Sequence, residues 1–278
     1  MLAWSQFYYP TTVSFDEKLK LIQINRLAKG CLSYMIISKG KATVVDPNRN
    51  VDFYLDLAHK ENATIVNVLD SHLHADHISG GPEIAKRTGA TYYLSESEGA
   101  QIPFEPLENH DKIHFGDVEV EVLAIKTPGH TPGSVSFLVN NQYLLSGDTI
   151  FVGGLGRPDL GGKAREWALD LYNTIFHKIK NLADDVLVLP AHYADIQEIN
   201  ENGIVGAILG DIRRNNIQMQ MEDKKQFIEF VASSANTTKP PNFEEIVLIN
   251  RGVKKVSPVE MTELEIGPNR CAVHHTTL

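Results

Sequence analysis

Short apolar runs separated by turn residues dominate the first half of the chain. Near residues 19–25, KLIQIN alternates apolar and polar positions, which is typical of a half-buried β-strand. The runs CLSYMIIS (31–38) and KATVVD (41–46) follow, and the Lys39-Gly40 pair between them is a hairpin signal. We therefore expect the chain to begin as a set of strands joined by tight turns.

Helical patterns interrupt the strands at intervals. Helices are expected at 50–61, in PEIAKRTG (82–89) and at 165–180. Further strands are expected at 64–71, 118–125, 134–139, 142–148 and 185–192. The run at 64–71 is β-branched and almost continuously apolar, which indicates a buried strand. Together these elements predict an α/β (α+β) fold in which two β-sheets pack face to face, with helices outside them.

After residue 200 the pattern changes. Segments 203–214 and 222–234 have a helical pattern, NTTKPPN (236–242) is a linker, and EEIVLIN (244–250) is a final strand candidate. We expect residues 1–200 to form the catalytic domain. Residues 201–278 would then be a short helical and strand appendage that belongs to the same unit.

Composition and charge exclude several classes of protein. The net charge of −9 disfavours binding to nucleic acid. The chain contains no run of eighteen apolar residues, which is the length that a membrane-spanning helix needs. The start, MLAWSQFYYP, lacks the features of a secretory signal. The two cysteines, Cys31 and Cys271, form no disulfide framework and suit a reducing compartment. We therefore expect a cytoplasmic protein with neither a membrane nor a nucleic-acid partner.

Ligand-type side chains stand where predicted strands end. SHLHADH places His72, His74, Asp76 and His77 within six positions, directly after the strand at 64–71. His130 in TPGHTPGS, Asp148 in LLSGDTIF and His192 in LPAHYAD follow it. An isolated histidine is more often a packed residue, but four ligand-type residues in six positions are not explained by packing. Because imidazole and carboxylate together suit zinc, iron and manganese, the pattern predicts a metal centre.

The motifs SHLHADH, TPGH, SGDTIF and LPAH, in this order, resemble the metallo-β-lactamase superfamily. The resemblance covers roughly residues 20–200 and implies an αββα sandwich with metal ions at one edge of the two sheets. It implies one metal ion held by His72, His74 and His130, and a second held by Asp76, His77 and His192, with Asp148 able to bridge. With a single ion, the implied ligands are His72, His130 and Asp148, the ligand types of non-haem iron oxygenases.

The stretch GDTIFVGGLGRPDLGG (147–162) separates the branches of this superfamily. Thioester hydrolases of the glyoxalase II type have a similar GDT and GR, but usually aromatic residues after the arginine. Here GRPDL (156–160) resembles the persulfide dioxygenases (sulfur dioxygenases). In that family one Fe(II) binds a small thiol persulfide and O₂, and the outer sulfur leaves as sulfite. We therefore expect an iron-dependent oxidoreductase of sulfide metabolism, with one Fe(II) per chain, that releases the free thiol.

Two other functions stay open. The full set of seven ligand-type residues also fits a dinuclear zinc hydrolase acting on a thioester of the hydroxyacylglutathione type, with one or two Zn(II) per chain. A non-catalytic sensor of metal or persulfide is disfavoured because no residue of the motifs is lost. The superfamily relatives further suggest a homodimer or homotetramer, and a separate sulfurtransferase is a candidate partner.

Four residues near the ligands are candidates for roles in the reaction. Asp76 and His192 are the candidate catalytic residues, with Asp76 as an orienting carboxylate or proton acceptor. Arg157 is a candidate anchor for a substrate carboxylate, because its planar fork pairs with one bidentately; an ion pair with Asp159 explains it equally well. Tyr193 either contacts the substrate or is packed.

The remaining cysteines and histidines are expected to be structural. Cys31 starts a strand and is expected in the core. Cys271 is expected to be an inert thiol rather than a sulfur carrier. The pair His274-His275 belongs to the tail.

Overall fold

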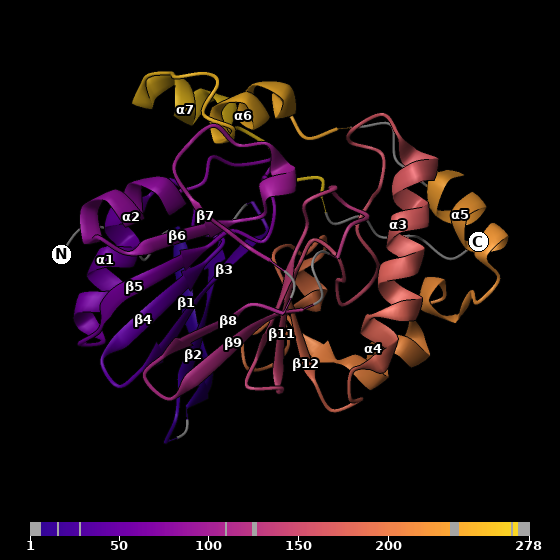
Figure 1. The fold of residues 1–278 in the computed structure, drawn as a ribbon, viewed down its shortest axis with the longest axis horizontal. Helices are drawn as coiled ribbons and strands as arrows, with labels where there is room; N and C mark the ends of the chain where they lie inside the picture. The colour runs from indigo at the N-terminus through magenta and orange to yellow at the C-terminus, as the bar shows by residue number, and fades with distance from the viewer. Residues whose placement is uncertain are drawn as a thin grey trace.

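The computed structural model describes residues 7–15, 17–27, 29–108, 110–123, 127–233, 239–267 and 269–271. Two β-sheets form the centre of the molecule (Figure 1). The first sheet has the strand order β1-β2-β3-β4-β5-β6-β7. Its strands are β1 (Tyr8–Phe15), β2 (Lys20–Arg26), β3 (Cys31–Ser38), β4 (Lys41–Val45), β5 (Thr64–Leu69), β6 (Thr91–Leu94) and β7 (Glu105–Pro106).

The second sheet has the order β13-β12-β11-β10-β9-β8. Its strands are β8 (Lys112–Phe115), β9 (Val118–Leu123), β10 (Ser136–Val139), β11 (Tyr143–Gly147), β12 (Leu187–Pro190) and β13 (Ala207–Ile208). The helices are α1 (Val51–Lys60), α2 (Gly81–Thr88), α3 (Ala164–His177), α4 (Leu209–Asn215), α5 (Lys224–Ser233), α6 (Phe243–Asn250) and α7 (Pro258–Leu264). Single 3₁₀ turns occur at Glu96–Glu98, Ile179–Asn181, Ile196–Glu198 and Gln218–Gln220.

The helices cover the outer faces of both sheets, as Figure 1 shows. Strand β2 explains how the layers form, since its side chains alternate between two cores. Leu21 packs between the sheets against residues such as Phe137, whereas Ile22 packs under α1 near Tyr54. Helices α3, α4 and α5 bury a third cluster, which includes Leu171, against the second sheet. The predicted αββα sandwich is confirmed.

One edge of the sandwich collects the carboxyl ends of parallel strands. Strand β5 runs parallel to β4 and β6, and β11 runs parallel to β12. Strands in parallel register end at the same side of a sheet, so the loops after β4, β5, β11 and β12 gather there. Helices α6 and α7 lie across one end of the same sandwich (Figure 1).

The predicted hairpin at Lys39-Gly40 is confirmed, with Ser38 and Lys41 paired across it. Both turn residues have positive φ, 47° and 72°, as the tight turn of a two-residue hairpin requires. The predicted strand at 118–125 is present as β9, but residues 124 and 125 lie outside the described part of the chain. The same holds for residues 236–238 of the predicted linker, for residue 234 and for His274-His275.

The C-terminal part corrects two predictions. EEIVLIN (244–250), predicted as a strand, is helix α6, in which Ile246 and Asn250 are buried one turn apart. An apolar run of this length is ambiguous between strand and helix by periodicity. In a strand, Leu248 would share the face of Ile246 and Asn250, but it is exposed, as helical spacing requires. Segment 203–214, predicted as helical throughout, contains β13 before α4, because Ala207 and Ile208 pair with β12. Strands β1, β6, β7 and β8 and helix α7 were not predicted.

Among the helices of the described residues, none combines the length and apolar character needed to cross a membrane.

Candidate metal centre

The SHLHADH segment forms an irregular loop after β5, and its polar side chains all point into the protein. His72, His74, Asp76 and His77 are each no more than 2 % exposed. Burial of four ionisable side chains is costly unless each is paired or binds a metal ion. The atoms that contact these side chains therefore indicate whether the loop binds a metal ion.

Three buried ligand atoms converge from three different loops. His72 Nε2 lies 3.5 Å and His130 Nε2 lies 3.4 Å from Asp148 Oδ2. None of these three atoms has a hydrogen-bond partner. An unsatisfied buried polar atom costs about 1–3 kcal/mol, so three of them facing one another are hard to explain by packing. Two atoms that each bond one ion at about 2.0–2.2 Å lie no more than about 4.4 Å apart, and both distances satisfy this limit. The residues present therefore fit a metal ion.

The other atom of each ligand is held by a partner. Ser71 Oγ donates to Asp46 Oδ2 at 2.9 Å, so its oxygen accepts from His72 Nδ1 at 2.9 Å. The carbonyl oxygen of Arg157 accepts from His130 Nδ1 at 3.0 Å. Both histidines therefore carry their proton on Nδ1 and keep a lone pair on Nε2, which is the tautomer that a metal ion requires.

The electrostatics of this cluster support the same protonation states. Burial lowers the pKa of His72 well below 6.5, and the neighbouring His74 lowers it further. Burial also lowers the pKa of His130, although the charge of Asp148 opposes it. Burial raises the pKa of Asp148, but the charge and hydrogen bond of His192, together with His72 and His130, outweigh this and hold that pKa well below its usual range. Two neutral imidazoles and one carboxylate are the forms that bind a cation.

A second cluster lies beside the first, and a hydrogen bond from His192 to Asp148 connects them. His192 Nδ1 donates to Asp148 Oδ1 at 2.6 Å, and His192 Nε2 lies 3.2 Å from Asp76 Oδ2. His77 Nδ1 lies 3.1 Å from Asp76 Oδ1. Burial lowers the pKa of His192, but the charges of Asp148 and Asp76 outweigh it and raise that pKa well above 6.5. Without a metal ion, His192 is therefore a cation between two carboxylates.

His74 lies between the two clusters, with its ring centroid 4.3 Å from that of His72 and 4.2 Å from that of His77, but its Nε2 faces two other carboxylates. Its Nε2 lies 3.3 Å from Asp46 Oδ1 and 3.9 Å from Asp70 Oδ1. Burial lowers the pKa of His74, but the hydrogen bond and charge of Asp46 outweigh it and raise the value to about 9. The structure thus brings six of the seven predicted ligands into two adjacent clusters and places the seventh against two aspartates. Its role as a ligand stays a prediction.

The two predicted substrate residues make contacts within the protein. The fork of Arg157 pairs bidentately with Asp159, at 2.7 Å from Nε and 2.5 Å from Nη2, and its side chain is 3 % exposed. Tyr193 donates from its hydroxyl to Asn25 Oδ1 at 3.1 Å. The roles of Arg157 and Tyr193 in substrate binding stay predictions.

The glycine before Arg157 has a structural reason. A Cβ at Gly156 would lie 1.9 Å from the carbonyl oxygen of Asp148 and 3.1 Å from His130 Cβ. Only glycine permits this approach, which brings the Arg157 carbonyl to His130. Gly156 of the GLGR sequence therefore helps to position the candidate ligand His130.

Sequence analysis missed several residues of the site. Asp46 and Asp70 directly follow β4 and β5, so their position at the carboxyl ends of predicted strands was a usable signal. Cys31 Sγ lies 3.1 Å from Asp76 Oδ2, and the Cys271 sulfur lies within 4.8 Å of ligand atoms of Asp148 and His192. No local pattern predicts these two contacts, because both depend on long-range pairing.

The C-terminal part of the chain fastens the loop. Asn250 of α6 donates from Nδ2 to the carbonyl oxygens of His74 and His77, at 2.8 and 2.9 Å. The Glu265 carboxylate accepts from the Ile78 N–H at 2.8 Å. These bonds fix the backbone that carries the ligands.

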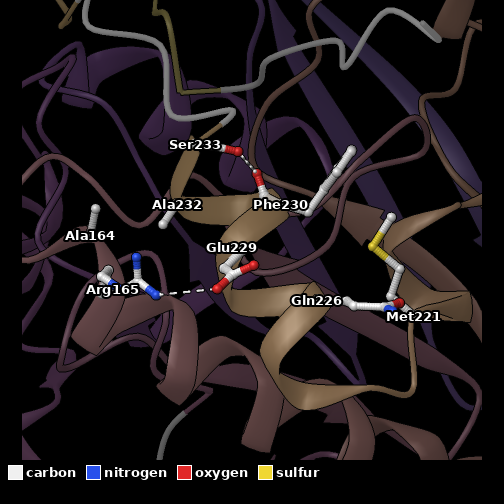
Figure 2. A pocket seen from close by; sticks show the side chains of 8 residues that line it. All are labelled: Ala164, Arg165, Met221, Gln226, Glu229, Phe230, Ala232 and Ser233. Carbon is white, nitrogen blue, oxygen red and sulfur yellow. Dashed lines mark hydrogen bonds and ion pairs between the residues drawn. The ribbon is translucent and has the colours of Figure 1, made fainter.

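The described residues also line pockets away from these clusters. Figure 2 shows one between the start of α3 and α5, where Arg165 and Glu229 form an exposed ion pair at 3.8 Å. None of the residues that line this pocket is a candidate ligand. It offers no chemistry comparable to that of the histidine clusters.

Comparisons with known proteins identify proteins that are similar to this chain in sequence and in fold. A family model described as the metallo-beta-lactamase superfamily matches residues 27–192. The mitochondrial persulfide dioxygenase ETHE1 of Mus musculus is 29 % identical over 219 residues, which cover 76 % of this chain and 78 % of that protein. The probable metallo-hydrolase YqgX of Bacillus subtilis (strain 168) is 28 % identical over 61 % of this chain and 88 % of its own length. The crystal structure of ETHE1 from Myxococcus xanthus has a TM-score of 0.72 and 28 % identity, covering 82 % of this chain and 96 % of that one.

Proposed function

The chain belongs to the metallo-β-lactamase superfamily, and we propose that it is an Fe(II)-dependent dioxygenase acting on a low-molecular-weight thiol persulfide. The observation that carries the proposal is the set of three unpartnered atoms on His72, His130 and Asp148. Two histidines and one carboxylate are the ligands of non-haem iron oxygenases. The similarity to two ETHE1 proteins supports the same reaction.

Fe(II) held by these residues would supply open positions for the persulfide sulfur and for O₂. A persulfide, O₂ and one water then give the free thiol, sulfite and two protons. His192 positions Asp148 through the 2.6 Å hydrogen bond from Nδ1, and Asp76 in turn orients the His192 ring. We therefore assign Asp76 and His192 as positioning residues of the reaction. Ser71 and the Arg157 carbonyl orient the two histidine ligands.

A zinc-dependent thioester hydrolase is the second candidate. Asp76, His77 and His192 lie beside the first cluster, so two metal ions could share the site. Paired metal ions activate water for hydrolysis. The similarity to the probable metallo-hydrolase of Bacillus subtilis favours this alternative. A cytoplasmic location, a homo-oligomer and a separate sulfurtransferase partner are further proposals of the same kind.

Oxygen uptake separates the two reactions. The protein is reconstituted anaerobically with Fe(II) or with Zn(II) and tested with the persulfides of glutathione and coenzyme A, and with a glutathione thioester. We expect O₂ uptake that depends on both Fe(II) and persulfide, with sulfite as the product. Thioester cleavage by the zinc form, with no persulfide-dependent O₂ uptake by the iron form, would contradict the proposal.

Two histidine variants refine this comparison. His130→Ala removes a ligand of the first cluster and should abolish both iron binding and O₂ uptake. His192→Ala removes the hydrogen bond to Asp148 and the contact with Asp76 but no proposed iron ligand, so we expect bound iron and partial activity, lower by roughly 10–100-fold. Equal and complete loss of iron and activity in both variants would place His192 among the iron ligands instead.

A further inference from the structure

Lys29, in the turn between β2 and β3, is a buried lysine without a carboxylate partner. Only 8 % of it is exposed, and no carboxylate of the described residues forms an ion pair with it. Its ammonium donates to the main-chain carbonyl oxygen of Glu265 at 2.8 Å. An ammonium has three protons to donate, so two of them find no acceptor among the described residues. Because a lysine is almost never buried unless its charge is paired, an anion is expected beside Lys29.

A pocket with a volume of about 240 Å³ opens beside Lys29. Arg26 of β2, Leu27 and Glu265 also line it, and the Leu27 side chain is exposed. Arg26 Nη1 is buried and has no hydrogen-bond partner among the described residues. The pocket is several times larger than the share of one water molecule, about 30 Å³, so a small anion and a few waters fit in it. Two cationic side chains with unused donors therefore border one pocket.

The carboxylate at this pocket does not balance the positive charge. Glu265 supplies the only carboxylate among the described residues that line the pocket. Its Oε2 lies 2.7 Å from Arg26 Nη2 and 3.1 Å from Arg49 Nε, so one negative charge already faces two guanidinium groups. Lys29 adds a third cation. Because burial of an uncompensated charge is costly, this excess of positive charge favours the binding of a counter-ion.

We propose that Lys29 and Arg26 bind a small inorganic oxyanion in this pocket, whose lining residues include no candidate metal ligand. An ammonium and a guanidinium both donate charge-assisted hydrogen bonds to such an anion. Phosphate, sulfate and sulfite share this chemistry. Sulfite is the product of the proposed dioxygenase, so its place in the pocket rests on the proposed function, whereas binding of phosphate does not.

The anion would join three parts of the chain. Lys29 contacts the C-terminal part through the Glu265 carbonyl, and the Lys29 carbonyl oxygen accepts from Asn269 Nδ2 at 2.7 Å. The Glu265 carboxylate accepts from the Ile78 N–H, in the loop that carries the histidines. An anion that compensates Lys29 and Arg26 therefore stabilises the connection between the β2–β3 turn, this loop and the C-terminal part.

Calorimetric titration of the metal-depleted full-length protein tests the site without any assay of activity. Phosphate, sulfate and sulfite are titrated separately, and metal depletion prevents their binding to a metal ion. We expect at least one of them to bind saturably at one site per chain and to raise the melting temperature as its concentration rises. Tighter binding of sulfite would identify the product of the proposed reaction as the ligand, and tighter binding of phosphate would identify phosphate; both results support the site. Absence of saturable binding of all three anions would overturn it, whatever the outcome of the O₂ uptake assay.

Two lysine variants form a matched pair. Lys29→Met keeps the length of the side chain but removes its charge, so we expect the affinity for the anion to fall by about tenfold or more. Lys180→Met removes a charge from an exposed ion pair with Glu222 and should bind the anion as the wild type does. Unchanged affinity in Lys29→Met, or equal losses in the two variants, would overturn the site.

A second pair leaves the buried residues untouched and decides the question if circular dichroism shows that Lys29→Met is not folded. Because Leu27 is exposed and lines the pocket, Leu27→Asp adds a negative charge there without altering the core. We expect repulsion to weaken anion binding by roughly threefold or more. Ile217→Asp, at an exposed position that does not line the pocket, should leave the affinity unchanged. Equal affinities in these two variants would count against an anion in this pocket.

Discussion

At the scale of single residues, hydrogen bonds define the candidate iron site. They occupy one atom of each ligand side chain and leave the other atom available to a metal ion. Ser71 shows this most directly, because its one hydroxyl proton goes to Asp46 and fixes the tautomer of His72. The ligands His72, His130 and Asp148 could be predicted from motifs, whereas the partners could not. Ser71 and the Arg157 carbonyl act through orientation, which no residue pattern specifies.

Removing the Ser71 hydroxyl tests this orientation. In Ser71→Ala, the His72 Nδ1 proton loses its acceptor, so the ring is free to turn or change tautomer. We expect the affinity for Fe(II) to fall by roughly 10–100-fold, as measured by competition with a chelator. Ser95→Ala is the matched control, because Ser95 is also buried but its hydroxyl has no hydrogen-bond partner. Equal losses in both variants would argue against the orienting role.

At the scale of elements, alternating and continuous apolar runs predicted most of the strands, including both arms of the Lys39-Gly40 hairpin. They failed at 244–250, where strand and helix are equally consistent with the run IVLI. The helix matters for the site, since it places Asn250 against the loop that carries the ligands. A strand in that position would turn Leu248, which is exposed, to the same face as Ile246 and Asn250. Tertiary packing therefore decided an element that local pattern left ambiguous.

Substituting Asn250 measures what helix α6 contributes. Asn250→Ala removes the donor to the His74 and His77 carbonyls and the acceptor for the Ser79 N–H. Buried partners left unsatisfied should lower the free energy of unfolding by about 1–3 kcal/mol in urea denaturation. Asn181→Ala, which removes one exposed hydrogen bond to the His177 carbonyl, should cost about 0.5 kcal/mol or less. Similar values for the two variants would mean that α6 does not fasten the loop.

At the scale of the whole molecule, the residues after 200 are tied to the first sheet by charge as well as by packing. The Glu265 carboxylate lies 2.7 Å from Arg26 Nη2 and 3.1 Å from Arg49 Nε, and it also accepts from the Ile78 N–H. The αββα layers followed from the sequence pattern. The contacts of Glu265 could not be predicted from the sequence pattern, because they join positions far apart in the chain.

The pH dependence of stability reports on this connection. Burial raises the pKa of Glu265, but Arg26 and the Ile78 N–H outweigh it, so the folded-state pKa lies below 4.5. A lowered carboxyl pKa stabilises the folded state above the unfolded-state value, and this contribution disappears as pH falls through the folded-state value. We expect Glu265→Gln to lower the free energy of unfolding by about 2 kcal/mol at pH 7. In urea denaturation, the difference should shrink below pH 4.5; a difference that stays constant with pH would exclude the ion pairs as its cause.

The bond between Ile78 and Glu265 also sets an order of events during synthesis. The two residues are 187 positions apart, so the ribosome makes the loop long before its fastening. At about 5–20 residues per second, the delay is roughly 10–40 seconds. During that interval the nascent chain carries its histidines on a loop without its final anchor. We therefore expect stable metal binding to follow translation of the segment that carries Glu265 rather than to accompany the emergence of the motif.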